Sequence, residues 1–188
     1  MAPRAGLDEA VVVRAAVELV DAEGLEGLNL SRLAERLGVR PPSLYKHVAG
    51  LDAVQRGIAL EGIRAIARRM THAAVGKAGD DAMLAIAEAY RVYAKEHPGL
   101  YAATLRAPAS EDREWIEASE EVLGIILRVL VPYGLDETGA LHAIRGLRSL
   151  VHGFASLESS GGFGMPLDID ESFRRLMVSF LQGLRSQV

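Results

Sequence analysis

The residues best suited to chemistry are five histidines and a set of glutamates, and their spacing argues against catalysis. The histidines stand at positions 47, 72, 97, 142 and 152, and no two share the i, i+4 spacing of a helical zinc site. There is no cysteine, so neither a thiolate metal site nor a cysteine nucleophile is available. Neither a glycine-rich phosphate loop nor a G-x-S-x-G elbow occurs. We therefore predict no catalytic residue, no metal and no cofactor, and an enzyme is the disfavoured class.

A cluster of hydrogen-bond donors between positions 40 and 48 is arranged as a binding face would be. Leu44 and Val48 form one apolar side of a short helix. Pro41-Pro42 suits its first turn, because proline fixes φ and lacks only an N–H that would be unbonded there. The opposite side would present donors to the outside: Arg40, Ser43, Lys46 and His47.

A second short helix is needed to hold this face, and residues 29–38 predict one. Asn29 can cap its first turn, and Gly38 suits the left-handed position that ends it. Two short helices, a tight turn and an outward row of donors predict a helix-turn-helix, although the spacing alone also fits a plain helical hairpin. The apolar side of the first helix recurs at i, i+3, i+4 and i+7: Leu30, Leu33, Ala34 and Leu37.

Specific residues favour DNA binding over the plain hairpin. The run Leu33-Ala34-x-x-Leu37-Gly38-Val39-x-x-Pro42-Ser43-Leu44-Tyr45-x-His47-Val48 resembles the DNA-binding domain of the tetracycline-repressor (TetR) family of bacterial regulators. The resemblance implies that phosphates are held by Tyr45 and His47, whereas packing of the Tyr45 ring against the first helix is the alternative. It also implies contacts to bases or backbone from Arg40, Pro41, Pro42, Ser43 and Lys46.

One position departs from the family pattern. A lysine that grips a phosphate usually begins the fourth helix of these regulators, and the matching residue here is Leu51. This departure supports an alternative function, an all-α interaction protein that no longer binds DNA.

Composition predicts an all-α protein. Ala, Leu, Glu and Arg dominate, and no sustained period-2 alternation is found. No apolar run approaches the roughly 18 residues that span a bilayer, and the first residues lack a signal-peptide core, so we expect a soluble, cytoplasmic protein. The net charge of −4 is uneven, since residues 1–72 hold 10 Lys and Arg against 9 Asp and Glu, and the rest hold 11 against 16. An acidic remainder would discourage indiscriminate contact with nucleic acid.

Small residues and glycines between Ala73 and Asp81 mark the predicted domain boundary. We assign a helix-turn-helix DNA-binding domain to 1–50, a linker helix to 51–72, and a ligand-binding and dimerisation domain, formed as a helical bundle, to 73–188. The first helix should run from Leu7 to Glu23. The later helices should cover 80–96, 100–105, a stretch capped by Ser110 to Val131, one capped by Asp136 to Glu158, and one capped by Asp170 to Arg185.

The C-terminal half resembles the TetR-like regulators said to carry a WHG domain, through His152-Gly153-Phe154, with Val151 in place of the motif's tryptophan. The last two long helices predict a homodimer built as a four-helix bundle from 136–158 and 170–185, while closure of a monomer core is the alternative. The stripe behind this prediction is Phe173, Leu176, Met177, Phe180, Leu181 and Leu184, facing the small residues Gly139, Ala143, Gly146 and Gly153.

A small-molecule site is predicted from apolar and aromatic residues in excess of what helix packing requires. The resembled family places its effector cavity between the linker helix and the helices that carry them. His152 interrupts an apolar run and is the expected polar anchor, although ordinary core packing is the alternative for each residue. The predicted ligand-binding residues are Tyr93, Tyr101, Trp115, Leu123, Leu127, His152 and Phe154.

Taken with the resemblance, the sequence predicts a ligand-responsive transcriptional regulator. Its expected partners are a double-stranded DNA operator, a small-molecule effector and a second copy of the chain, and no membrane. We expect a repressor that binds a palindromic operator and is released by a largely apolar small molecule.

Overall fold

The computed structural model describes residues 6–186, and within that range the regular secondary structure is entirely helical, nine α-helices and two short 3-10 helices. This confirms the predicted all-α class. The described residues cluster into two compact units. Unit 1 comprises the described residues up to Ile63 together with His97–Ala109, and unit 2 comprises Arg64–Glu96 together with the described residues from Ser110 onward.

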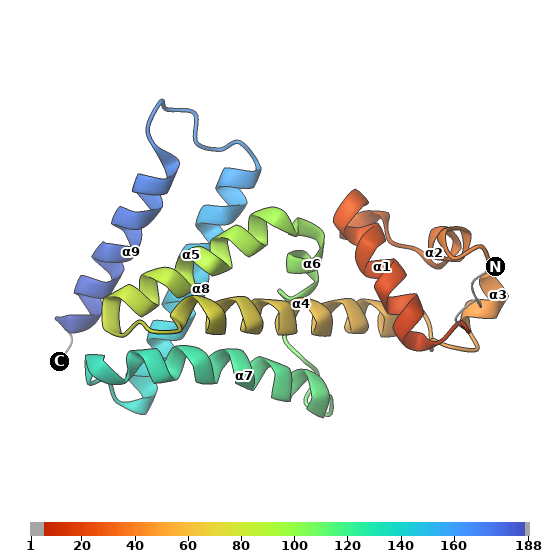
Figure 1. Ribbon diagram of the computed structural model, residues 1–188, viewed down its shortest axis with the longest axis horizontal. Coiled ribbons are helices and arrows are strands. Elements are labelled where there is room, and N and C mark those ends of the chain that lie inside the picture. The colour runs from red at the N-terminus through yellow and green to blue at the C-terminus, as the bar shows by residue number, and fades with distance from the viewer. Residues whose placement is uncertain (1–5, 187–188) are drawn as a thin grey trace. The chain divides into compact units, whose positions relative to one another are not determined.

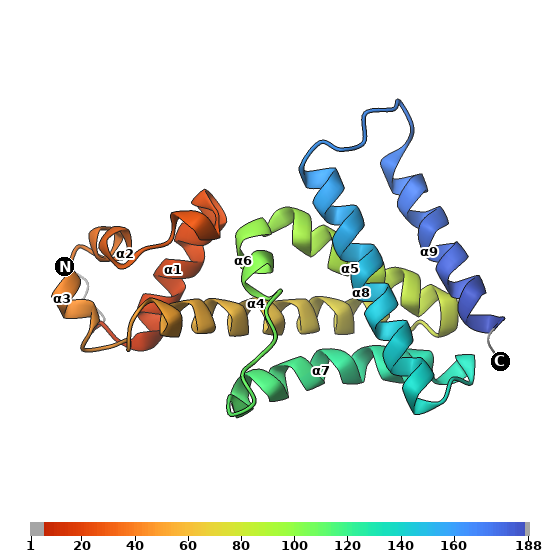
Figure 2. The same ribbon diagram turned by 180° about the vertical axis from the view of Figure 1, so that it is seen from behind.

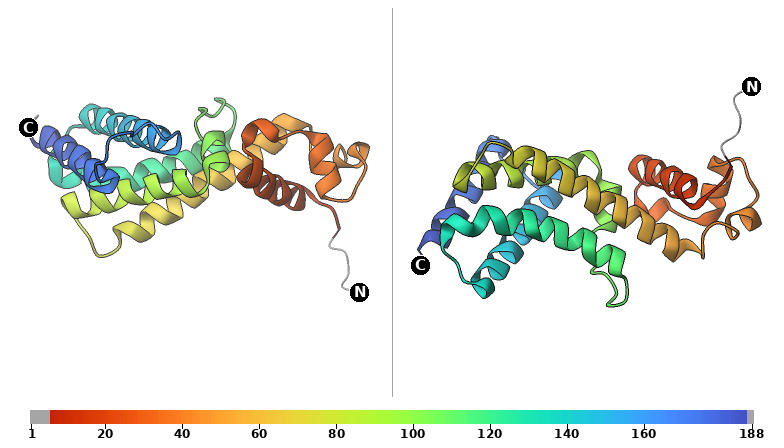
Figure 3. Two further views of the ribbon diagram at one scale, coloured as in Figure 1. Left: turned by 90° about the horizontal axis from the view of Figure 1, so that it is seen from above. Right: turned by 60° about the horizontal axis from the view of Figure 1, so that its bottom comes forward.

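Unit 1 is built around α1, which packs against α2 and α6. Its elements, at the red-to-orange end and in green in Figures 1 and 3, are α1 (Glu9–Glu23), η1 (Leu25–Gly27), α2 (Leu30–Arg36), α3 (Pro41–Leu44), the first part of α4 (Leu51–Ala74) and α6 (Pro98–Ala103). Helix α1 begins after Asp8 rather than at the predicted Leu7, because the Asp8 carboxylate caps it by accepting from the Val11 N–H at 2.7 Å. It ends at Gly24, whose φ of 79° suits a residue without a Cβ.

The core of unit 1 is almost wholly apolar. Its one buried polar side chain among the described residues is Thr104, whose hydroxyl donates to the Tyr101 carbonyl at 2.8 Å. The buried apolar residues follow the helical periodicity of the sequence and include Val12, Ala16, Leu19, Val20, Leu33, Ala34, Leu44, Val48, Val54 and Ile58.

Unit 2 is centred on α5, which packs against α7, α8 and α9. Its elements are the second part of α4, α5 (Gly79–Glu96), α7 (Arg113–Leu130), η2 (Val131–Tyr133), α8 (Glu137–Ser159) and α9 (Ile169–Arg185). Helices α8 and α9 form an antiparallel pair joined by a loop, coloured in shades of blue in Figures 1 and 2. The core includes Met83, Ile86, Ile125, Ile126, Leu147, Val151, Met177 and Leu181.

Two of the helix caps predicted in unit 2 are wrong, and one is confirmed. The N-cap of α7 is Asp112, which accepts from the Trp115 N–H at 3.2 Å, and not Ser110. The N-cap of α9 is Asp168, which accepts from the Glu171 N–H at 2.9 Å, and not Asp170. In each case the cap immediately precedes the first helical residue and reaches the third N–H of the helix. The predicted cap of α8, Asp136, accepts from the Gly139 N–H at 2.7 Å.

None of the helices described between residues 6 and 186 has the length and apolarity that a bilayer crossing requires.

Candidate functional site

The turn between α2 and α3 has the geometry that the sequence predicts. The Asn29 side chain accepts from the Arg32 N–H at 3.0 Å and so caps α2. Gly38 adopts a φ of 66°, and the next residue, Val39, donates its N–H to the Ala34 carbonyl at 2.9 Å. This closes the end of α2 in the way typical of a glycine-terminated helix.

Helix α3 is short, but its hydrogen bonding continues beyond its last residue. Arg40 precedes it in an extended conformation, and Pro41 and Pro42 occupy its first turn. After Leu44 the backbone continues in hydrogen-bonded turns, because the His47 and Val48 N–H groups both donate to the Leu44 carbonyl, at 2.8 and 3.0 Å. Leu44 and Val48 are buried and anchor this segment to the core of unit 1.

The predicted DNA-contact residues lie on the outer side of this segment. Arg40, Pro41, Pro42, Tyr45 and Lys46 are exposed, while Ser43 and His47 are half-buried. Tyr45 is 62% exposed, which argues against the alternative in which its ring packs against the first helix.

The charges around this segment separate into paired and unpaired groups. The guanidinium of Arg32 is paired with Glu23, and that of Arg36 with Glu18 at 2.7 Å. Among the residues that the structure describes, the side chains of Arg40 and Lys46 make neither a hydrogen bond nor an ion pair. Two exposed cations on a turn anchored by buried residues suit contacts to phosphates and base edges.

The predicted ligand-binding residues are divided between the two units. Tyr101 belongs to unit 1, and the other six belong to unit 2. Tyr93 and Phe154 are buried, whereas Leu127 is 36% exposed. The remaining three, Trp115, Leu123 and His152, are half-buried.

Trp115 has a feature expected of a ligand contact. Its indole Nε1–H is enclosed, yet no acceptor for it is present among the described residues. An enclosed donor without an acceptor is unfavourable, so a polar atom delivered from outside the chain would stabilise it.

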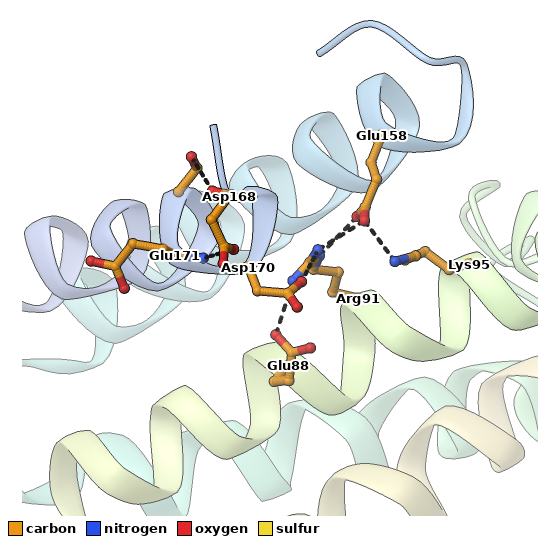
Figure 4. A network of polar contacts seen from close by, with 8 residues as sticks. Glu88, Arg91, Lys95, Glu158, Asp168, Asp170 and Glu171 are labelled. Carbon is orange, nitrogen blue, oxygen red and sulfur yellow. Dashed lines mark hydrogen bonds and ion pairs between the residues drawn. The ribbon is translucent and has the colours of Figure 1, made fainter. Parts of the chain in front are cut away.

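Unit 2 also contains a buried cation that sequence reasoning missed. Arg91 of α5 is 1% exposed, and its Nε and Nη2 donate to the two carboxylate oxygens of Glu158, both at 2.8 Å. Nη2 also donates to Asp170 at 2.7 Å, and Lys95 donates to Glu158 at 2.6 Å. Figure 4 shows these side chains converging from α5, the end of α8 and the start of α9. We call Arg91, Glu158 and Asp170 the Arg91 network.

Aromatic rings and charges complete the surroundings of the guanidinium. The rings of Phe154 and Phe173 lie 5.2 and 4.9 Å from it. Burial lowers the pKa of Arg91, but its hydrogen bonds to Glu158 and Asp170, together with the charges of Glu88 and Glu158, raise that pKa above its ordinary value. The hydrogen bond from Arg91 lowers the pKa of Glu158. Phe154, predicted as a ligand contact, is therefore also part of the packing around Arg91.

A signal for this network is present in the sequence. Arg91 follows Ala87 by four residues and precedes Ala94 by three, and all three are buried. Glu158 follows Phe154 by four residues and Val151 by seven, at the end of the buried side of α8. A charged residue at an inward position on each of two amphipathic helices indicates a buried pair.

The fold and the exposed donors of the turn define a class, the all-α proteins with a helix-turn-helix. Residues 83–180 match the family model described as "Tetracyclin repressor-like, C-terminal domain". The chain is 38% identical to the uncharacterized HTH-type transcriptional regulator YobS of Bacillus subtilis (strain 168), over 98% of this chain and 96% of that protein. It is 35% identical to the uncharacterized HTH-type transcriptional regulator Rv0681 of Mycobacterium tuberculosis (strain ATCC 25618 / H37Rv), over 96% and 83%. The chain belongs to the TetR family of helix-turn-helix transcriptional regulators.

A solved structure agrees at the level of the fold. A TetR from Acinetobacter baumannii AYE in complex with minocycline has a TM-score of 0.74 and 20% identity, covering 97% of this chain and 98% of that one. The family predicted from residues 33–48 is thus confirmed, and its members are regulators rather than enzymes. The narrower resemblance to the WHG subgroup stays a prediction.

Proposed function

We propose that this protein is a transcriptional repressor whose homodimer binds a palindromic operator and is released by a small molecule. The proposal rests on two cations, Arg40 and Lys46, on the turn anchored by Leu44. Both are exposed, and neither side chain has a partner among the described residues. Long cations at base edges give sequence specificity, and contacts to phosphates give affinity that falls with salt.

The proposed operator contacts can be tested residue by residue. In gel-shift titrations with the DNA that flanks its own gene, Lys46→Ala should weaken binding by about 1–3 kcal/mol. Tyr45→Phe should weaken all sequences alike, because it removes a phosphate contact. Arg36→Ala is the matched control, since Arg36 is exposed, lies on the preceding helix and is already paired with Glu18.

Two outcomes would contradict this assignment. If Lys46→Ala and Tyr45→Phe bind operator as tightly as the wild type, this face does not read DNA. If the wild type binds no DNA even at low salt, the interaction protein becomes the better description. That second candidate is favoured by Leu51, an apolar and half-buried residue where the family usually has a lysine.

The proposed dimer would use the outer sides of α8 and α9. Phe173, Met177, Leu181 and Leu184 are buried within the chain itself, so much of the predicted stripe closes the core of unit 2. On α9, the half-buried Leu176 and Phe180 remain available to a partner subunit. On α8, Leu141 is 46% exposed and Gly153 has open space beside it. A twofold pair would present its two turns to half-sites about 34–36 Å apart. A monomer mass from light scattering at micromolar concentration would refute the dimer.

The proposed effector would bind near Trp115, where the enclosed indole N–H lacks an acceptor. The minocycline complex of the similar Acinetobacter structure supports a small-molecule effector by analogy. The effector can release DNA only if it favours one arrangement of the dimer over another, and α4, which contributes residues to both units, is the proposed connection. A compound that raises the melting temperature of the wild type and of Trp115→Ala/His152→Ala equally would show that it binds elsewhere.

A further inference from the structure

A groove of about 640 Å³ in unit 2 is lined by α4 and α5, which run side by side in this unit (Figure 3). None of the seven predicted ligand-binding residues lines it. The floor is apolar and made of small side chains, Ala73 of α4 with Ala85, Ala89 and Val92 of α5. The rim carries three basic residues of α4, Arg68, Arg69 and His72, and one acidic residue of α5, Glu88.

The charged residues of the rim differ in their partners. Arg69 donates to Glu96 at 2.6 Å and lies 5.4 Å from the centre of the Tyr93 ring. Glu88 lies 3.4 Å from Arg91, and the Arg91 guanidinium also bonds to Glu158 and Asp170 (Figure 4). Arg68 is exposed and has no partner among the described residues, and His72 stands one helical turn beyond it on the same side of α4. Arg68 is therefore the cation of this rim that is left for a ligand.

The apolar floor sets the size of a matching ligand. Ala85, Ala89 and Val92 recur at i, i+4 and i+7, which gives a strip about 10 Å long on one side of α5. Small side chains keep this strip low, so a narrow apolar body can lie along it. A volume of about 640 Å³ lies within the range typical of sites for small organic molecules.

We propose that this groove binds a small organic carboxylate with a short aliphatic or aromatic body. The carboxylate pairs with the Arg68 guanidinium, whose planar array of N–H donors matches both carboxylate oxygens. The apolar body covers Ala85, Ala89 and Val92 and removes them from water. This site is separate from the region around Trp115, and its occupation does not depend on DNA binding.

The test uses the full chain and two probes of equal apolar body, sodium octanoate and neutral 1-octanol. Titrations followed by amide chemical shifts should show saturable shifts at Ala85 and Ala89 with octanoate, and markedly weaker binding of 1-octanol. Arg68→Gln should raise the dissociation constant for octanoate about tenfold, the change that corresponds to the loss of about 1.4 kcal/mol. It should leave the binding of 1-octanol unchanged.

Two further variants separate the groove from other apolar surfaces. Ala89→Phe fills the groove and should abolish octanoate binding, with unchanged circular dichroism showing that the fold is intact. Arg128→Gln, an exposed arginine on α7 outside the groove, should bind octanoate like the wild type. Trp115 is the only tryptophan in the chain, so its fluorescence reports on the other proposed ligand region and should not respond to octanoate.

Any of three results would overturn the proposal. These are equal affinity for octanoate and 1-octanol, unchanged octanoate binding by Arg68→Gln and Ala89→Phe, and a Trp115 fluorescence change that saturates together with octanoate. Because operator binding is measured in a separate assay, none of these results affects the proposed repressor function.

Discussion

The two units hold distant parts of the chain together in opposite ways. In unit 1, α6 lies so close to α1 that a Cβ on Gly99 would overlap the Val20 carbonyl oxygen. In unit 2, the start of α9 and the end of α8 are held to α5 by the buried guanidinium of Arg91. Val20 and Gly99 in unit 1 are 79 positions apart, and Arg91 and Asp170 in unit 2 are also 79 apart, so both kinds of contact join distant segments.

The comparison shows that each contact is sensitive to a different kind of change. A backbone-to-backbone contact has no charge to lose but no room for an added atom. A buried ion pair tolerates modest changes in packing but not the loss of one partner, because the other charge is then left without compensation. Substitutions should therefore act on unit 1 through volume and on unit 2 through charge.

The largest expected effect comes from removing the buried cation. Arg91→Ala should lower the free energy of unfolding by about 3–5 kcal/mol, because the half-buried Glu158 loses two hydrogen bonds and keeps only the one from Lys95. Urea denaturation followed by circular dichroism measures this. Arg175→Ala is the control, since its pair with Glu171 is exposed to solvent and should contribute little to stability. A loss no larger than that of the control would show that the Arg91 network does not hold α8 and α9 to α5.

The next effect tests the contact in unit 1. Gly99→Ala should lower the free energy of unfolding by about 1–3 kcal/mol, because the added methyl group forces α6 away from α1. Gly124→Ala on α7 meets only the flexible end of Arg128 at 3.5 Å, so better helix propensity should stabilise the protein by up to about 1 kcal/mol. If both substitutions stabilise the protein equally, the approach of α6 to α1 is not limited by volume.

The smallest expected effect is the fall in the free energy of unfolding at acidic pH. The pKa of Glu158 lies below its ordinary value of 4.5, so the ionised form stabilises the folded state above that pH. This stabilisation is lost as the pH falls through the ordinary value toward the lowered one. The free energy of unfolding of the wild type should therefore fall more steeply on acidification than that of Glu158→Gln. Parallel curves for the two proteins would contradict the role given to Glu158.

The elements that follow from local rules could be predicted from the sequence. The caps at Asn29 and Asp136 and the left-handed Gly38 depend on residues within a few positions of one another, and all are confirmed. The caps at Ser110 and Asp170 were wrong because a second capping residue, Asp112 or Asp168, stands two positions away. Propensity alone does not choose between two candidates so close together.

The buried polar part of unit 2 could not be predicted to the same extent. An inward position identifies Arg91 and Glu158 as unusual, but the 67 positions between them hide the fact that they are partners. The same holds for the close contact of Gly99 with Val20, which depends on α6 returning to α1. The outward position of the donors on the turn, in contrast, could be predicted from the sequence. The apolar residues Leu44 and Val48 identify the buried side of this segment, and the donors lie on the opposite side.

Unit 1 is assembled from two stretches of chain separated by α5 and the end of α4. A fragment cut after the helix-turn-helix would lack α6 and would expose to water the side of α1 around Val20. Unit 1 therefore cannot be exchanged between relatives as a single continuous cassette, and recombination that preserves it has to carry residues 97–109 along. The same interleaving couples the folding of the two units, because the chain leaves unit 1 and returns to it before unit 2 is complete.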